Sequence, residues 1–289
     1  MGLVNRESRA SRIGLVTVAF RSTAKIRSLL ATVPAASRHR VDVVVVDNLP
    51  GGDAELHAEL HGSDVRLVAR PDNPGYGGGV NAGVAALDPT VDWILVVNPD
   101  VELRPGAIDA LLEVGLSDDR IGSVGPRIVD NRGTTYPSAR AIPSLTVGVG
   151  HALFGDIAPT NPWTRDYHRQ SEYTEQRDAG WLSGACVLIR RAAFDAIGGF
   201  DDDFFMYFED VDLGYRLGRD GWRNVYAPSA LVEHEGGHST KGNSAVMIAA
   251  HHASARLWIA KRYPGAFRAP VRWSVMLGLR IRQRFVTNR

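Results

Sequence analysis

Three acidic side chains within four residues, Glu209, Asp210 and Asp212, are spaced for acid–base chemistry. They follow the aromatic run 204–208 and begin a predicted helix, on which Glu209 and Asp212 share one face while Asp210 points elsewhere. Acids also occur at helix N-termini for dipole reasons alone. The large apolar neighbours favour partial burial of at least one of the three, which raises a carboxyl pKa and suits a general base.

A fourth acid, Asp100, ends the apolar run 91–97 within the turn Asn98-Pro99-Asp100. A continuous apolar run rich in β-branched residues indicates a central parallel strand that is covered on both faces. Ligands of open α/β sheets lie beyond the carboxyl ends of such strands. Asp100 therefore stands where a divalent cation on a nucleotide diphosphate can be held. A turn-forming or helix-capping aspartate is the alternative.

The elements that must position these acids alternate along the chain. The pattern predicts strands at 13–20, 41–46, 65–69, 91–97, 121–124, 181–190 and 222–227, and helices at 23–33, 53–61, 80–87, 105–114, 192–197, from 209 and at 244–263. Such alternation predicts βαβ units and an α/β fold with a Rossmann-like, mostly parallel central sheet flanked by helices. Residues 131–178 are expected to form long loops with short elements.

Two further motifs have both a structural and a functional interpretation. The glycine-rich stretch 75–79 matches neither the P-loop nor the GxGxxG pattern, so a tight strand-to-helix turn is the structural alternative to a phosphate loop. His234 precedes a glycine pair that disfavours a helix. A lone histidine is usually structural, and His234 becomes a candidate ligand only if it faces Asp100.

Composition and charge exclude several classes of protein. One cysteine in 289 residues excludes an internal disulfide and a multi-cysteine metal site, so we expect a reducing cytoplasmic setting, and we identify no secretory signal or transmembrane helix. Residues 236–289 carry ten basic side chains and no acid, whereas residues 1–235 carry 23 basic against 32 acidic. A basic segment of this kind indicates an anionic partner: a membrane surface, a lipid phosphate or a nucleic acid.

Several motifs, in their order over residues 13–240, resemble those of family 2 glycosyltransferases of the GT-A fold. They are Thr17, Asp47-Asn48, Asn73-Pro74-Gly75-Tyr76, Asn98-Pro99-Asp100, Trp181-Leu182-Ser183-Gly184, Glu209-Asp210-Val211-Asp212 and His234. The segments 136–140, 161–164, 180–184, 205–214 and 249–252 are similar in particular to actinobacterial rhamnosyltransferases that act on decaprenyl-diphospho-N-acetylglucosamine.

The resemblance implies a GT-A catalytic domain at 1–240, with a nucleotide-sugar half at 13–130 and an acceptor half at 131–240, followed by a helical basic segment at 241–289. It implies dTDP-L-rhamnose as donor, polyprenyl-diphospho-GlcNAc as acceptor, and inverting transfer that makes the linkage unit between arabinogalactan and peptidoglycan. Mg²⁺ or Mn²⁺ is the implied cofactor. The implied location is the inner face of the plasma membrane, as a peripheral protein held by its basic segment.

The same resemblance implies roles for individual residues. Asp210 is the implied base, and Asp100 is the metal ligand, with His234 as an additional ligand because Asn98 replaces the first acid of the usual DxD turn. The implied nucleotide-sugar residues are Thr17, Asp47, Asn73, Gly75, Tyr76, Asn98 and Asp100, with Asp47 bonding the pyrimidine ring. The implied acceptor-side residues are Trp181, Gly184, Glu209, Asp212 and Arg216, the last as a diphosphate contact. Leu49-Pro50 departs from the Gly-Ser of many relatives, which bears on the finer nucleotide contacts.

Three rival interpretations remain. A related transferase with another donor or lipid-linked acceptor fits the same motifs. A nucleic-acid-binding protein would use the basic segment, but that segment has few aromatic residues for stacking, so we expect no nucleic-acid partner. A non-catalytic sugar-nucleotide-binding relative would not need Asp100, Asp210 and His234 together. An oligomer is compatible with the sequence.

Overall fold

The computed structural model describes residues 11–143, 173–235, 244–266, 269–270, 273 and 276. The strands are β1 Ile13–Ala19, β2 Val41–Asp47, β3 Arg66–Ala69, β4 Trp93–Val97, β5 Val101–Leu103, β6 Ile121–Val129, β7 Thr135–Tyr136, β8 Ala139–Arg140, β9 Arg177–Ala179, β10 Trp181–Leu182, β11 Cys186–Arg190 and β12 Arg223–His234. The helices are α1 Thr23–Ala36, α2 Ala54–Leu60, α3 Gly75–Ala86, α4 Ala107–Leu116, α7 Arg191–Ala196, α8 Glu209–Arg219 and α9 Ser244–Arg262.

The central sheet has the strand order β3-β2-β1-β4-β11-β6-β12-β5, with β7 on β6 and β9 on β12. The strands β3, β2, β1 and β4 pair in parallel, as the βαβ pattern predicts. β11 runs antiparallel between β4 and β6, and β12 is parallel to β6. The α/β prediction with a Rossmann-like sheet is confirmed, and β11 marks the boundary between its parallel half and its mixed half.

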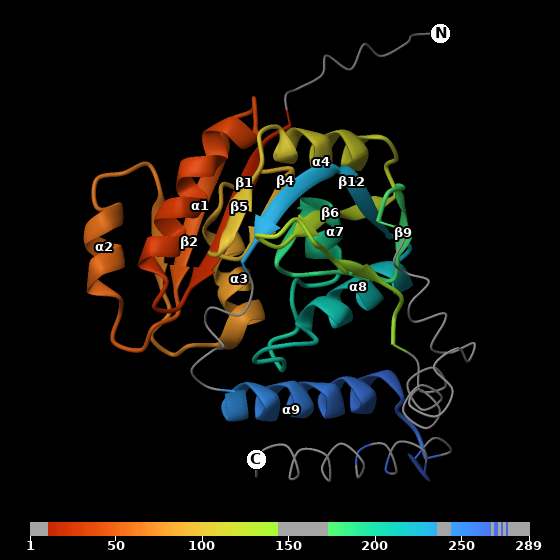
Figure 1. Ribbon diagram of the computed structural model, residues 1–289. Helices are drawn as coiled ribbons and strands as arrows, with labels where there is room; N and C mark the ends of the chain where they lie inside the picture. The colour runs from red at the N-terminus through yellow and green to blue at the C-terminus, as the bar shows by residue number, and fades with distance from the viewer. Residues whose placement is uncertain are drawn as a thin grey trace, which may run out of the picture.

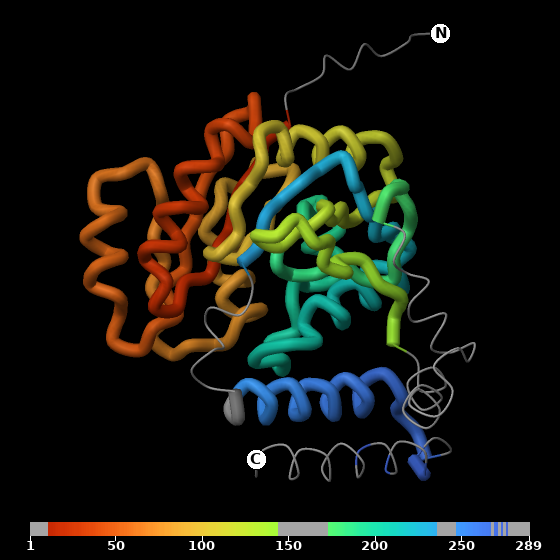
Figure 2. Tube along the Cα trace, viewed as in Figure 1, coloured from red at the N-terminus to blue at the C-terminus, as the bar shows by residue number. Residues whose placement is uncertain are grey.

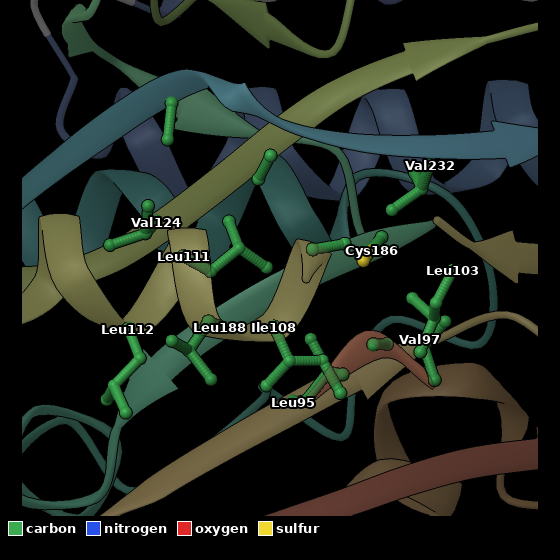
Figure 3. Packing of buried hydrophobic residues seen from close by; sticks show 14 of the residues in the cluster. Leu95, Val97, Leu103, Ile108, Leu111, Leu112, Val124, Cys186, Leu188 and Val232 are labelled. Atoms are coloured by element: carbon green, nitrogen blue, oxygen red, sulfur yellow. The ribbon is translucent and has the colours of Figure 1, made fainter. Parts of the chain in front are cut away.

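Helices cover the sheet on both faces and bury two apolar layers (Figure 1). One layer joins α1 and α4 to the sheet, and it contains fully buried side chains such as Leu29, Leu95 and Leu111. Figure 3 shows α4 side chains Ile108 and Leu111 above the strands that carry Leu95 and Leu188. The other layer joins α3, α7 and α8 to the opposite face. Burial on both faces explains the continuous apolar runs of β1 and β4.

Several elements differ from the sequence prediction, and the following differences lie beside candidate site residues. The predicted strand 181–190 is interrupted at Ser183–Ala185, between β10 and β11. The predicted strand 222–227 continues as β12 to His234, and the short strand β5, which was not predicted, pairs with its end. Helix α3 begins at Gly75, inside the glycine-rich stretch, rather than at residue 80.

Helix α9 lies beside α8 and the loop that precedes it (Figures 1 and 2). Trp258 and Ile259 of α9 pack with Trp181, Phe204 and Val211 in one buried cluster. Ser254 Oγ donates to the carbonyl of Met206 at 2.7 Å, and Lys261 bridges Asp201 and Asp203. Helix α9 therefore holds in place the loop that leads into α8 and its three acids, Glu209, Asp210 and Asp212.

Of the basic segment 241–289, which we expect to contact the membrane, residues 241–243, 267–268 and all those after 270 except Trp273 and Met276 lie outside the described residues. Trp273 is 65% exposed. Within the described part of the chain, no helix has the length and apolar character needed to cross a membrane.

Candidate active site

Asp210 lies in the first turn of α8, and its carboxylate is held by main-chain N–H groups. Gly184 N donates to Oδ2 at 3.1 Å, and Val211 N donates to Oδ1 at 2.8 Å. Gly184 lies in the interruption between β10 and β11. The predicted strand is therefore broken at the residue whose N–H donates to Asp210. Each carboxylate oxygen can accept a further hydrogen bond.

The backbone just before α8 adopts an unusual conformation. Tyr207 and Phe208 both have left-handed φ angles, of 66° and 65°. Two consecutive non-glycine residues in this region are costly and persist where surrounding contacts impose them. Here Tyr207 and Phe208 both contact the ring of His251 on α9, with ring centroids 5.4 Å apart in each pair. Helix α9 thus contributes to the placement of the acids of α8.

Glu209 and Asp210 are neighbouring acids in a region of low solvent access. Glu209 is 7% exposed, and its Oε2 has no hydrogen-bond partner among the described residues. Burial, with the charge of Asp210, raises the pKa of Glu209 to about 8. Burial also raises the pKa of Asp210, although the N–H groups of Gly184 and Val211 and the charge of Arg140 act in the opposite direction. A Glu209 that keeps its proton at neutral pH leaves Asp210 as the anionic member of the pair.

Asp212 and Arg216 form an ion pair one turn apart on α8. Arg216 Nε donates to Asp212 Oδ2 at 2.6 Å, and its Nη1 donates to the carbonyls of Ile197 and Gly199 at 2.9 and 2.8 Å. Burial raises the pKa of Asp212 against the opposing effect of Arg216. These contacts tie α8 to the turn after α7. They favour a supporting role for both residues, and the predicted diphosphate contact of Arg216 gains no support from them.

Asp100 faces His234 in the structure. The sequence analysis made His234 a candidate ligand only if the two side chains met in this way. Asp100 follows β4, His234 ends β12, and His234 Nε2 lies 3.1 Å from Asp100 Oδ1. Burial acts to raise the pKa of Asp100, but the hydrogen bond and charge of His234, with Lys25 nearby, outweigh it, so the pKa is lowered. The unpredicted pairing of β5 with β12 brings the two side chains together.

The donor set of Asp100 and His234 fits a divalent cation shared with a diphosphate. Asp100 Oδ1 and His234 Nε2, which lie 3.1 Å apart, would offer such a cation one oxygen and one nitrogen donor. The described residues contain no group of three or more candidate ligand side chains. Mg²⁺ in nucleotide sites commonly takes one or two protein ligands and completes its shell with phosphate oxygens and water.

The Asp100–His234 pair and Asp210 are connected through the turn at residues 183–185. Asn98 N donates to the carbonyl of Ala185 at 2.9 Å, next to Gly184, which holds Asp210. The hydroxyl of Tyr76 donates to the Gly184 carbonyl at 2.7 Å. Burial raises the pKa of Tyr76 well above its ordinary value, and the charges of Glu209, Asp210 and Asp100 add to that effect. Tyr76 therefore lies between the two groups of acids and keeps its proton.

The glycine-rich stretch begins α3 by a tight turn. Asn73 and Gly75 have positive φ angles of 43° and 83°. A Cβ at Gly75 would lie 2.0 Å from the Phe205 carbonyl oxygen, which accepts a hydrogen bond from Tyr76 N at 3.0 Å. The glycine is required because α3 begins against the loop that leads to α8. The predicted tight turn is present, and it positions Tyr76; the phosphate-loop interpretation stays a prediction.

Asp47, the predicted base-binding residue, is engaged by its own loop. Its Oδ1 accepts Leu49 N at 2.9 Å, and its Oδ2 accepts Asp53 N at 2.7 Å and lies 2.9 Å from His57 Nε2. The side chain is only 1% exposed. Asp47 thus organises the turn between β2 and α2, while the 41% exposed side chain of His57 forms the outer surface of this pair.

The remaining predicted residues differ in their access to a ligand. Thr17 is fully buried on β1, and its Oγ1 lacks a partner among the described residues. Asn98 is half-buried beside Asp100. Trp181 is 9% exposed, donates from Nε1 to the Ala141 carbonyl at 3.1 Å, and packs against α8. Gly184 is buried, but a Cβ there would make only ordinary contacts, at 3.5 Å from Asp210 and Tyr76.

Sequence reasoning missed three residues that the structure brings to this region: Lys25 near Asp100, His57 on Asp47 and Arg140 near Asp210. Lys25 and Arg140 belong to elements far from the acids in sequence, and no local spacing indicates their approach. His57 had a faint signal, because it lies in the short helix predicted directly after Asp47.

The family model "Glycosyltransferase like family 2" matches residues 10–253. The chain is 42% identical over 283 residues to the N-acetylglucosaminyl-diphospho-decaprenol L-rhamnosyltransferase of Mycobacterium tuberculosis, covering 95% of this chain and 92% of that protein. It is 25% identical over 172 residues to the rhamnosyltransferase WbbL of Escherichia coli, covering 59% of this chain and 62% of that protein.

Two solved structures share the fold. A mannosyltransferase from Pyrobaculum calidifontis in complex with GDP-Man and Mn²⁺ superimposes with a TM-score of 0.58 at 15% identity, over 96% of this chain and 72% of that one. GalNAc-T7 with UDP, GalNAc and Mn²⁺ gives a TM-score of 0.54 at 15% identity, over 79% of this chain and 44% of that one. Both likenesses extend to the fold alone.

Proposed function

The chain belongs to glycosyltransferase family 2, and from that premise we propose that it transfers L-rhamnose from dTDP-L-rhamnose to N-acetylglucosaminyl-diphospho-decaprenol with inversion. The product is the rhamnosyl-GlcNAc linkage unit that joins arabinogalactan to peptidoglycan. The observation that carries the proposal is the 42% identity over nearly the whole length of a relative named for this acceptor and sugar.

On the donor side, Asp100 and His234 are the residues that would hold Mg²⁺ or Mn²⁺. When bound, such a cation neutralises the diphosphate that leaves with the nucleotide. Asn98 fixes the turn that carries Asp100, and Tyr76 anchors the 183–185 turn on the other side. Thr17 and Asp47 lie near the carboxyl ends of β1 and β2, and Asn73 and Gly75 lie in the turn from β3 to α3; we place the nucleoside at this edge of the sheet.

On the acceptor side, Asp210 takes the proton of the attacking hydroxyl. The acceptor oxygen bonds to the anomeric carbon of rhamnose, while the bond from that carbon to the phosphate oxygen breaks and its electron pair leaves with dTDP. A single displacement inverts the anomeric configuration. The two main-chain N–H groups on Asp210 fix the orientation of its carboxylate. Because Glu209 is neutral, no second negative charge lies beside Asp210. Trp181 and Gly184 border the acceptor.

The acceptor lipid places the reaction at a membrane surface. Its polyprenyl chain stays in the bilayer, so the catalytic domain must reach the diphospho-sugar from the water phase. The ten basic side chains of residues 236–289, with no acid among them, suit an anionic inner leaflet. We therefore place the protein at the cytoplasmic face of the plasma membrane, bound peripherally through this segment.

The alternative within the family is another nucleotide sugar or another lipid-linked or polysaccharide acceptor on the same site. The deciding experiment measures transfer from dTDP-L-rhamnose to a short-chain prenyl-diphospho-GlcNAc, with and without EDTA. We expect product that EDTA abolishes and added Mg²⁺ or Mn²⁺ restores. Binding of dTDP-L-rhamnose without product would reject this acceptor, and absence of both would reject the rhamnose donor.

A matched pair of variants tests the metal assignment in the same assay. Asp100→Ala is expected to lose the metal-dependent part of donor binding, because it removes the anionic ligand of the pair. Glu113→Ala, an exposed acid on α4, serves as control and is expected to behave as the wild type. Metal dependence that is unchanged in Asp100→Ala would reject Asp100 as the ligand.

A further inference from the structure

Among the described residues, the guanidinium of Arg140 has no acidic partner, and its charge acts on the carboxyl of Asp210. Its Nε donates to the Pro137 carbonyl at 2.9 Å. Its Cζ lies 5.5 Å from the centroid of the Tyr136 ring and 5.6 Å from that of Trp181. Across the described residues, no carboxylate pairs with Arg140, and its Nη1 and Nη2 make no hydrogen bond. The cation is therefore fixed in place while its two terminal nitrogens remain available.

The strand pair β8–β10 carries Arg140 to this position. Arg140 pairs with Trp181, and Gly180 N donates to the Arg140 carbonyl at 2.8 Å. The same strand β10 leads directly into Gly184, which donates to Asp210. Arg140 and the catalytic carboxylate are therefore attached to one short, hydrogen-bonded unit.

The charge of Arg140 acts on the acceptor side of the site. Arg140 influences the carboxyl of Asp210 and the hydroxyl of Tyr173. The groups that influence Asp100 are instead His234 and Lys25. The Arg140 cation and the Asp100–His234 pair, where we place the diphosphate of the donor, thus act on different carboxylates of the site.

We propose that Arg140 binds the diphosphate of the lipid-linked acceptor and thereby sets the position of the acceptor sugar against Asp210. This inference rests on the proposed function, because it assumes a diphospho-linked acceptor. A guanidinium presents a planar fork of donors that matches phosphate oxygens. Stacking on Tyr136 and Trp181 fixes the side chain before the ligand arrives, so little rotamer entropy is lost on binding.

Two acceptors separate this role from an effect on Asp210 or on the fold. With prenyl-diphospho-GlcNAc, Arg140→Met is expected to raise the acceptor KM by about tenfold to a hundredfold, the usual effect of losing a charge-assisted hydrogen bond. The KM for dTDP-L-rhamnose stays unchanged. With octyl-GlcNAc, which has no diphosphate, Arg140→Met and the wild type are expected to react at rates within about twofold of each other. Equal losses on both acceptors would overturn the proposal.

Control variants keep the result interpretable. Arg219→Met removes an exposed arginine that also lies over a tyrosine ring, that of Tyr215 at the end of α8, and is expected to leave both KM values unchanged. Arg140→Lys keeps the charge without the fork and is expected to give an intermediate acceptor KM. If Arg140→Met proves unstable in thermal unfolding, Arg140→Lys carries the test, and an unchanged acceptor KM in that folded variant would overturn the proposal.

A binding measurement separates this inference from the proposed function. Geranyl diphosphate, titrated calorimetrically in EDTA, is expected to bind the wild type and Arg219→Met alike and to bind Arg140→Met at least about tenfold more weakly. Equal binding to all three proteins would overturn the role of Arg140. Failure of the wild type to transfer rhamnose to any acceptor would reject the proposed function and leave this binding result standing.

Discussion

The main-chain N–H of Gly184 donates a hydrogen bond to Asp210 Oδ2 over 3.1 Å. This contact joins the interrupted strand between β10 and β11 to the first turn of α8. It orients the carboxylate that we propose as the base, and the Tyr76 hydroxyl holds the same glycine by its carbonyl. The position of the base is thus set by main-chain groups from two different elements.

Replacing Asp210 by Asn tests the base directly. The amide retains the size of the carboxylate and one acceptor oxygen, so it keeps a bond to only one of Gly184 N and Val211 N, and it cannot take a proton. We expect kcat to fall by about 10²–10⁴, the usual contribution of a general base, with donor binding within about twofold of the wild type. Transfer kinetics and calorimetry of dTDP-L-rhamnose measure the two quantities. Turnover at the normal rate would remove Asp210 from this role.

Asp119→Asn is the control for that variant. Asp119 is an exposed acid after α4, so its loss changes the net charge equally without touching the site. A comparable fall in kcat for Asp119→Asn would mean that general electrostatics, not proton transfer, explains the effect.

Gly184 and Gly214 give opposite predictions for substitution by alanine. A Cβ at Gly184 would lie 3.5 Å from both Asp210 Cβ and Tyr76 Cε1, which is ordinary contact. A Cβ at Gly214 would lie 2.6 Å from Trp181 Cβ and 2.7 Å from its Cα. We expect Gly184→Ala to fold normally and to raise the acceptor KM, since the methyl group occupies space beside the base. Gly214→Ala is expected to lose about 1–3 kcal/mol of unfolding free energy by overpacking.

Urea unfolding and acceptor kinetics check this pair together. A Gly184→Ala variant with the acceptor KM of the wild type would show that the acceptor does not approach this glycine. A Gly214→Ala variant as stable as the wild type would contradict the close packing of α8 on β10.

The raised pKa of Glu209 predicts how stability depends on pH. The unfolded carboxyl has a pKa of 4.5, and burial with the charge of Asp210 raises it to about 8 in the folded protein. Between these values the folded state binds more protons than the unfolded state. The contribution of Glu209 is therefore full below pH 4.5 and is lost as pH rises toward 8, with a slope of at most about 1.4 kcal/mol per pH unit.

Glu209→Gln is expected to flatten this slope, because the amide does not titrate. Urea unfolding at several pH values between 5 and 8 measures it. Glu113→Gln, on the exposed face of α4, is the control and should retain the slope of the wild type. An identical slope in Glu209→Gln and the wild type would show that another group titrates in this range.

The sequence predicted the approach of Asp100 and His234, where we propose the metal, better than it predicted the contacts of Asp47, for a physical reason. Asp100 follows a buried strand, and the carboxyl end of such a strand can be located from an apolar run alone. His234 could be named only conditionally, because its approach to Asp100 depends on the pairing of β5 with β12. The carboxylate of Asp47 has its hydrogen bonds filled because the following loop brings Asp53 N and His57 Nε2 to Oδ2. No periodic pattern in a sequence specifies such loop geometry.

Asp47→Asn is expected to destabilise the protein by about 2–3 kcal/mol, because the amide has one acceptor oxygen in place of two and leaves a buried N–H unpaired. Leu49 N and Asp53 N bond to different carboxylate oxygens, so an amide cannot satisfy both. Urea unfolding measures the loss. Asp42→Asn, at the opposite end of β2 and more exposed, is the control with an expected effect below about 1 kcal/mol.

Calorimetry of dTDP on the folded Asp47→Asn variant then addresses the nucleoside. A large loss of affinity supports the predicted bond from Asp47 to the pyrimidine ring. Unchanged affinity would limit Asp47 to organising the loop. A variant as stable as the wild type would contradict the hydrogen bonds described for Asp47.

Deleting residues 270–289 tests the proposed membrane contact. The deletion removes five arginines, and each arginine near an anionic surface contributes about 1 kcal/mol. We expect binding to phosphatidylglycerol vesicles to fall by at least about a hundredfold at low salt. Stability should change little, because Trp258 and Lys261 of α9 precede the deletion and keep their contacts with Phe204 and Asp201. Vesicle binding that survives the deletion would move the membrane contact to another surface, and RNA binding without vesicle binding would favour a nucleic-acid partner.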